Sequence, residues 1–165
     1  YTRPEWLPLT LSADKPDEML AELNALANDE IDAWVHAAAV LDYVVKSPAE
    51  GKLASQQGPL TVELIESSKH ILELKKKCSD AVRIGFKLET GIKQKELVRR
   101  AFSQLEYAEM TAVVANRLED INDDTKPRAY LVDSTGADYT LQTMLDVCVV
   151  VIIIYIYIYG LYIKH

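Results

Sequence analysis

The stretch AVRIGFKLETGIKQKELVRRAFSQLEYAEMTAVVAN (residues 81–116) decides the fold. It holds two mostly apolar runs, AVRIGF (81–86) and TAVVAN (111–116), on either side of the amphipathic segment 93–110. In that segment apolar side chains recur at helical spacing, namely Leu97, Val98, Ala101, Phe102 and Leu105. Strand, helix and strand in this order predict two parallel strands joined by a right-handed crossover.

The rest of the chain extends this alternation of helices and strands. A helix is expected over 12–29, capped by Ser12 or Asp14 and with Pro16 in its first turn. Further elements are expected as a short strand within 1–11, a strand buried on both faces at 32–40, a hairpin at 51–67, a helix at 67–80 and a hairpin at 128–141. Together they predict an α/β fold with a three-layer, mostly parallel Rossmann-like sheet.

Composition narrows the function classes. The chain has 165 residues and a net charge of −7, which argues against a nucleic-acid partner because such proteins carry a basic face. Its two cysteines, Cys78 and Cys148, form no CxxC pair and no spacing with histidine, so no metal site or disulfide framework is expected. This usage fits a reducing compartment and a cytoplasmic protein. The glycine-rich phosphate loops of common nucleotide-binding folds are absent.

Three of the predicted strands pass abruptly from apolar to polar residues. The changes fall in AAAVLDY (37–43), GFKLETG (85–91) and VVANRLED (113–120). In open parallel sheets, ligands bind outside the carboxyl ends of the strands. The three junctions therefore predict one mouth at this edge of the sheet.

These junctions, together with GKLASQQGPLTVEL (51–64), resemble motifs of phosphopantothenoylcysteine synthetase, the phosphopantothenate–cysteine ligase family of coenzyme A biosynthesis. Four motifs occur in the family's order and spacing, over about residues 30–142. The resemblance implies a ligase that condenses 4′-phosphopantothenate with cysteine, using ATP or CTP and Mg²⁺. It also implies a homodimer, with the hairpin region reaching toward the partner subunit.

The resemblance also implies site residues. Those expected to bind nucleotide are Ala38, Ala39, Phe86, Lys87, Leu88 and Asn116, and those expected to bind substrate are Asp42 and Lys52. Fixed positive charge suits an anionic substrate, and an amide side chain both donates and accepts hydrogen bonds. Without the motifs, the lysines would be surface residues, and Asp42 and Asn116 turn formers. The motifs favour the site for Lys87 and Asn116 and leave Lys52 and Asp42 open between the two interpretations.

Three departures from the family pattern shape the expectation. The family's first βαβ unit, with its Gly-Gly-Thr turn and Asn-x-Ser-Ser-Gly loop, has no counterpart in residues 1–165, so we expect a fragment and assign no catalytic residue. The lysine that marks the fused bacterial enzymes is missing, so the choice between ATP and CTP stays open, with FKLET favouring ATP. The apolar tail 147–165 is read as a translated repeat, in preference to a membrane anchor or a strand.

The sequence thus predicts a partial ligase domain over 1–146, followed by a low-complexity tail. The first alternative is a non-catalytic remnant of the family that binds a nucleotide or pairs with a full-length subunit. A membrane-anchored interaction protein rests on the tail alone. A nicotinamide oxidoreductase ranks last, because the dinucleotide-binding glycines are missing. Whether a flavin decarboxylase is fused to this domain does not follow from the sequence.

Overall fold

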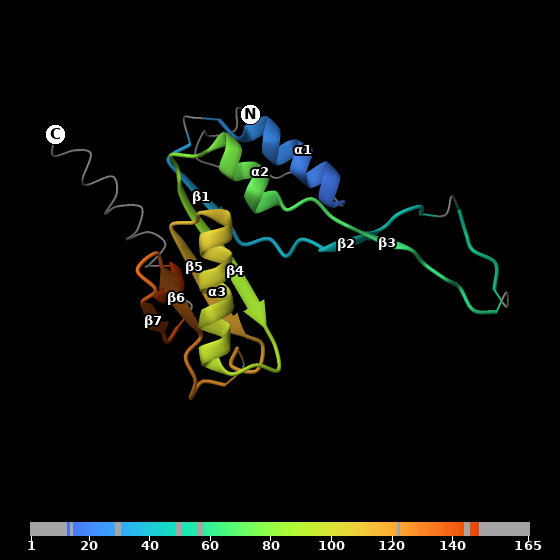
Figure 1. The fold of residues 1–165 in the computed structure, drawn as a ribbon. Helices are drawn as coiled ribbons and strands as arrows, with labels where there is room; N and C mark the ends of the chain where they lie inside the picture. Colours follow the sequence, from blue (N-terminus) through green and yellow to red (C-terminus); the bar gives the residue numbers. More distant parts are fainter. Residues whose placement is uncertain are drawn as a thin grey trace, which may run out of the picture. The chain divides into compact units, whose positions relative to one another are not determined.

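The computed structural model describes residues 13, 15–28, 31–48, 51–55, 58–121, 123–143 and 146–148 (Figure 1). The chain divides into two compact units, one of residues 1–26 and 39–70 and the other of residues 27–38 and 71–165. The predicted caps Ser12 and Asp14, the strand expected within 1–11 and the tail beyond residue 148 lie outside the described residues.

The second unit is built on a five-stranded sheet with the order β1-β4-β5-β6-β7. Strands β1, β4 and β5 run parallel to one another, and β6 and β7 continue the sheet in antiparallel fashion. The bounds are β1 (Ala33–His36), β4 (Val82–Glu89), β5 (Ala112–Arg117), β6 (Ala129–Asp133) and β7 (Asp138–Leu141). The sheet confirms the predicted α/β class, the parallel pairing of the two apolar runs and the second hairpin.

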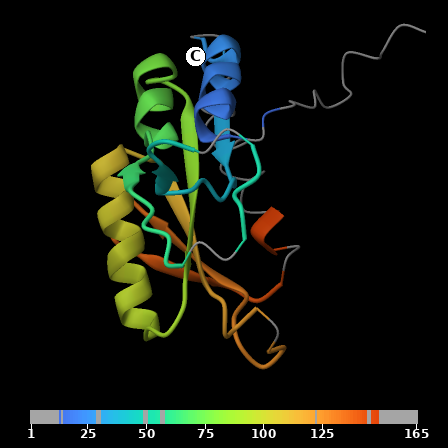
Figure 2. The same ribbon diagram turned by 90° about the vertical axis from the view of Figure 1, so that its right-hand side faces the viewer.

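Helix α3 (Gln94–Ala108) lies along one face of this sheet, as Figures 1 and 2 both show. Its apolar stripe, which includes Leu97, Ala101 and Leu105, packs on Val113 and Val132 of the strands. Helix α2 (His70–Lys77) adds Ile71 and Leu72 to the same cluster. The helical periodicity of 93–110 therefore predicted both the helix and the side that it buries.

The opposite face of the sheet carries a second apolar cluster. It consists of Val82, Ile84, Ala112, Val114, Ala129, Leu131, Leu141 and Val147, with Ala33 and Phe86 packed against it. Consecutive residues of β5 thus fall into different clusters, as the alternation of side chains along a strand requires. Residues Ala112–Ala115 are buried without interruption, which explains the continuous apolar run.

Gly85 lies in the middle of β4, where the backbone is closely approached from the α3 side. A Cβ atom at this position would lie 2.6 Å from Met110 Sδ and 3.1 Å from Gln104 Nε2. Packing therefore favours glycine here, because a side chain would displace the end of Met110, which is itself buried. The glycine does not end the strand.

The first unit contains helix α1 (Pro16–Leu26) and a two-stranded ribbon of β2 (Tyr43–Val45) and β3 (Leu64–Glu66). Helix α1 begins at Pro16, which the sequence placed in its first turn, and none of its residues is buried. In the ribbon, Tyr43 pairs with Glu66 and Val45 with Leu64. We call the described residues from Tyr43 to Glu66 the arm.

Three expectations about strands were wrong in their details. The first hairpin pairs 43–45 with 64–66, because the aromatic and β-branched residues of YVV form a strand better than the stretch from Gly51 to Ser55. Strand β1 covers only Ala33–His36 and leaves Val35 45% exposed, since among the described strands it pairs only with β4. Strand β4 continues to Glu89, so Lys87 lies within the strand and not beyond its end.

Two further features concern the helices and the cysteines. Among the described helices, none combines the length and apolarity that crossing a bilayer requires. Both cysteines are free, with Cys78 buried and Cys148 exposed.

Candidate functional site

The carboxyl ends of β1, β4 and β5 lie at the same edge of the sheet. His36 at the end of β1 is in register with Gly85, and Glu89 at the end of β4 is in register with Arg117. Within the second unit, this edge collects the predicted nucleotide-binding residues Ala38, Phe86, Lys87, Leu88 and Asn116.

The pleat of β4 divides these residues between the two faces of the sheet. Leu88 is in register with Asn116, and both lie on the face of the cluster that includes Phe86. Lys87 is in register with Ala115 and lies on the α3 face. Leu88 is 55% exposed and Asn116 is half-buried, so an apolar and an amide side chain stand next to each other near the edge.

A chain of ion pairs runs from Lys87 to α3. Lys87 Nζ lies 3.1 Å from Glu89 Oε1, and Arg100 Nη1 lies 2.9 Å from Glu89 Oε2. Arg100 Nε in turn donates to Glu96 Oε1 at 2.9 Å, and Arg99 also donates to Glu96. These hydrogen bonds, first from Arg99 and then from Arg100, lower the pKa of Glu96 to about 2.

The turn after β4 is fixed by the segment that follows β5. The backbone N–H of Gly91 and the hydroxyl of Thr90 both donate to Glu119 Oε1, the latter at 2.8 Å. These hydrogen bonds lower the pKa of Glu119, with the bond from Gly91 as the main cause. Leu118 N–H donates to the carbonyl of Glu89 at 2.9 Å. The two polar junctions at the sheet edge are thus tied directly to each other.

Arg117, next to Asn116, reinforces this tie. Its guanidinium donates to both carboxylate oxygens of Asp120, at 2.7 and 2.8 Å, and to the carbonyl of Ile92 at 3.0 Å. The hydrogen bond to Asp120 raises the pKa of Arg117. Hydrogen bonds and ion pairs thus hold Glu89, Arg100, Arg117 and Glu119 in place at this edge of the sheet, and we call these residues the polar framework.

Sequence reasoning missed the members of this framework, namely Glu89, Arg100, Arg117 and Glu119. One signal was available for Glu89, because residues two apart on a strand share a face, so Glu89 had to lie beside Lys87. The partners on α3 and after β5 carried no such local signal.

The other predicted site residues, Ala39, Asp42 and Lys52, belong to the first unit. Asp42 is exposed and forms an ion pair with Lys69, while its backbone carbonyl accepts from Ser67 N–H at 2.9 Å. Ala39 is also exposed. Lys52 lies on the arm, directly after Gly51, and is also exposed.

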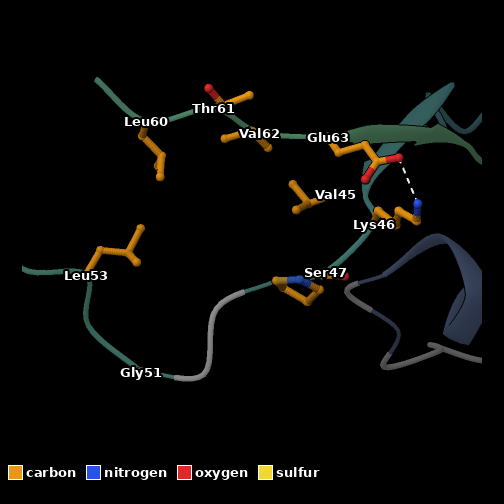
Figure 3. Close-up of a pocket in the computed structure, with 10 residues that line it drawn as sticks. Val45, Lys46, Ser47, Gly51, Leu53, Leu60, Thr61, Val62 and Glu63 are labelled. Atoms are coloured by element: carbon orange, nitrogen blue, oxygen red, sulfur yellow. Dashed lines mark hydrogen bonds and ion pairs between the residues drawn. The ribbon is translucent and has the colours of Figure 1, made fainter. Parts of the chain in front are cut away.

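The arm encloses a hollow of about 530 Å³ (Figure 3). Val45, Leu53, Leu60 and Val62 line it, and an ion pair of 2.8 Å between Lys46 and Glu63 closes one end. Leu53 is 56% and Leu60 69% exposed. The lining is therefore apolar and largely open to solvent.

No group of three or more histidine, cysteine or acidic side chains that could hold a metal ion occurs within the part of the chain that the structure describes.

Comparison with known proteins assigns the family. The model of the DNA/pantothenate metabolism flavoprotein C-terminal domain matches residues 10–148. The coenzyme A biosynthesis bifunctional protein CoaBC of Thermococcus kodakarensis is 36% identical over 117 residues, which are 70% of this chain and 29% of that protein. The protein of the same name from Methanocaldococcus jannaschii is 38% identical over 101 residues, or 61% of this chain and 24% of that protein. The chain thus spans less than a third of the curated relatives that it matches.

Solved structures agree at the level of the fold. The DNA/pantothenate metabolism flavoprotein from Streptococcus pneumoniae superposes with a TM-score of 0.67 at 18% identity, over 82% of this chain and 68% of that one. A Cab2 mutant in complex with phosphopantothenate-cysteine gives 0.62 at 20% identity, over 78% of this chain and 44% of that one. The match of the family model over most of the sequence confirms the resemblance seen in its motifs, and the chain belongs to the DNA/pantothenate metabolism flavoprotein C-terminal domain family.

Proposed function

We propose that the chain is part of a phosphopantothenate–cysteine ligase, which condenses 4′-phosphopantothenate with cysteine in coenzyme A biosynthesis. The observation that carries the proposal is the shared edge of β1, β4 and β5, where the motifs GFKLETG and VVANRLED pair in parallel register and the motif AAAVLDY begins directly after β1. Two relatives named for coenzyme A biosynthesis support it, as does the Cab2 fold, which was solved with phosphopantothenate-cysteine.

The reaction joins a carboxylate to an amine. A nucleoside triphosphate, ATP or CTP, activates the carboxylate of 4′-phosphopantothenate as an acyl-nucleotidyl or acyl-phosphate intermediate. Activation releases pyrophosphate in the first case and the nucleoside diphosphate in the second. The cysteine amine then attacks the activated carbonyl and loses a proton, so that the amide forms and the nucleoside monophosphate or the phosphate, respectively, leaves. Negative charge develops on the phosphates, so fixed cations and N–H donors at that point accelerate the step.

The residues at the sheet edge divide these tasks. Lys87 supplies positive charge to the triphosphate, and Asn116 offers both a donor and an acceptor to the base or ribose. Phe86 and Leu88 give an apolar surface for the nucleotide. The small side chains of Ala38 and Ala39 allow its close approach. Mg²⁺ enters with the triphosphate.

Two residues of the first unit bind the other substrate in this proposal. Asp42 orients 4′-phosphopantothenate or its metal, and Lys52 pairs with its phosphate or carboxylate. Because Asp42 already forms an ion pair with Lys69, the substrate would meet a carboxylate whose charge is partly balanced. The two free cysteines suit a reducing, cytoplasmic location.

The ligase is also proposed to work as a homodimer through the arm. Exposed apolar residues gather there, including Tyr43, Leu53, Leu60, Val62 and Leu64. An isolated two-stranded ribbon is marginally stable in water, so contact with a second subunit would stabilise it. The same arm supports the second function, in which the chain is a non-catalytic partner of a full-length subunit.

The experiment follows 4′-phosphopantothenoylcysteine formation with ATP and with CTP, for this chain and for the full product of its gene. Lys87→Ala should lower turnover by about a hundredfold, because the variant lacks the cation that stabilises the negative charge developing on the phosphates. Lys95→Ala, a matched change of an exposed lysine on α3, should leave turnover unchanged.

Each outcome decides between the functions. Product formed by the full protein and lost with Lys87→Ala supports the ligase and the assigned lysine. Near-normal turnover of Lys87→Ala contradicts the role of Lys87. Nucleotide binding or pairing without product, from chain and full protein alike, favours the non-catalytic partner.

A further inference from the structure

Glu89 holds a position between two cations at the end of β4. One carboxylate oxygen lies 3.1 Å from Lys87 Nζ and the other lies 2.9 Å from Arg100 Nη1. The side chain of Glu89 is 16% exposed, against 33% for Lys87 and 42% for Arg100. A carboxylate withdrawn this far from water needs charged partners, and Glu89 has one on each oxygen.

The helix side of this arrangement does not depend on Lys87. Arg100 is also bound by Glu96, which lies one helical turn before it on α3 and receives two hydrogen bonds from Arg99. Arg100 therefore anchors Glu89 from a helix that is packed on the sheet. If Lys87 turns to another anion, Glu89 keeps a charged partner.

The strand side is equally fixed. Lys87 is in register with Ala115 of β5, and Glu89 with Arg117, so the backbone of both residues lies in the parallel ladder. The lysine ammonium carries three donors on a flexible stem of four carbons. One donor directed to Glu89 restricts that stem and leaves two donors for an incoming anion.

We propose that Glu89 is a positioning residue, which holds the Lys87 ammonium ready for the phosphates of the nucleotide, with Arg100 fixing Glu89 in turn. The inference rests on the proposed role of Lys87 in triphosphate binding. A lysine held by a glutamate is an established way to present positive charge to nucleotide phosphates, as the lysine–glutamate pair of protein kinases illustrates.

The first test requires no nucleotide. Trace acetylation of the folded chain, read by mass spectrometry, gives the modification rate of Lys87 relative to Lys95 in the same molecule. Glu89→Gln should raise the relative rate of Lys87 severalfold, because the ammonium loses its carboxylate partner. The matched control is Glu73→Gln, which removes the same charge from the exposed pair with Lys76 on α2. It should leave the ratio unchanged.

The second test uses binding of MgATP and of CTP, measured by calorimetry. Whichever nucleotide binds the wild-type chain, Glu89→Gln should lower its affinity by about tenfold, the scale of one charge-assisted hydrogen bond. In a Lys87→Ala background, Glu89→Gln should cause no further loss, because Glu89 acts through Lys87. An equal loss in both backgrounds would indicate a purely structural role and overturn the proposal.

Arg100→Gln provides a second route if Glu89→Gln fails to fold. Arg100 lies on the exposed side of α3, and its loss should raise acetylation of Lys87 and weaken nucleotide binding in the same direction, by a smaller factor. An unchanged acetylation ratio in Glu89→Gln, or in Arg100→Gln where Glu89→Gln does not fold, overturns the inference, whatever the nucleotide does. If the wild-type chain binds neither nucleotide, the proposed nucleotide site fails, while the acetylation ratio still decides whether Glu89 positions Lys87.

Discussion

Arg83 shows how a single buried charge can join a helix to a strand. It is only 6% exposed, although it lies near the start of β4. Its guanidinium donates to the carbonyl of Ala108 at 3.3 Å and to that of Glu109 at 2.7 Å. These carbonyls end α3, where helix geometry leaves acceptors without partners and favours a nearby cation.

We therefore expect Arg83→Met to lower the free energy of unfolding by about 2 kcal/mol or more, since two hydrogen bonds from a charged donor are lost. Arg99→Met is the matched control, because its side chain is 66% exposed, and it should cost much less stability than Arg83→Met. Urea unfolding of both variants measures the difference. Equal losses would show that Arg83 contributes no more than a surface arginine.

Glu96 gives a prediction about pH. Its pKa is lowered to about 2 by Arg99 and Arg100, so its folded-state pKa lies below its unfolded value. A group of this kind stabilises the fold above its unfolded pKa, and the contribution disappears as the pH falls from about 4.5 toward 2. Carbon-13 NMR of the Glu96 carboxyl should give a midpoint near the low end of this range.

Removing Arg99 tests the cause of that shift. In Arg99→Met, the midpoint of Glu96 should move up toward the ordinary glutamate range, because the hydrogen bond that lowers it most is lost. High salt should move it in the same direction, since the group is exposed. A midpoint that stays in place under both changes would contradict the assigned cause.

The partners of these side chains could not be predicted from the sequence. The pair of Glu89 and Arg100 spans eleven positions, and its formation depends on how α3 is rotated on the sheet. Arg83 reads in sequence as a polar interruption of an apolar run. Its role becomes clear only in the structure, where the last carbonyls of α3 accept hydrogen bonds from its guanidinium.

At the scale of elements, periodicity located most of the second unit because one face of each element is buried. The stripe of α3 and the uninterrupted run of β5 match Leu97, Ala101, Val113 and Val114, all nearly inaccessible to solvent. The arm was misplaced because its strands bury no face, so alternation at 61–65 did not identify the paired residues. Strand β3 itself is exposed throughout.

That exposure makes the arm testable as an interface. Replacing Leu60 and Val62 by serine should weaken self-association, because these side chains are 69% and 49% exposed and available for a partner. Circular dichroism should stay unchanged, since the residues support no core. The measurement is sedimentation equilibrium over a range of concentrations.

The control for the arm is Tyr107→Ser on α3. Tyr107 is 66% exposed and large, so its loss removes a comparable apolar surface from the second unit. It should leave the association constant unchanged. An association constant equal in the arm variant and the wild type would rule out the arm as the dimer contact.

At the scale of the whole chain, the two units differ in what holds them together. Every described apolar residue that is buried belongs to the second unit, where two clusters cover the two faces of the sheet. Among described residues of the first unit, α1 and the ribbon bury no apolar side chain. The four motifs predicted the family without revealing this difference, because a motif reports local spacing and not the amount of buried surface.

Hydrogen exchange should therefore separate the units. Amides of β4, β5 and β6 should exchange only through global unfolding, while those of β2 and β3 should exchange through local opening at much lower free energy. If the arm joins two subunits, its protection must rise with protein concentration, because association stabilises only the associated state. The amides of α1 serve as the internal control and should not respond. If the protection of β2 and β3 is low and independent of protein concentration, the prediction that the arm joins two copies of this chain is wrong.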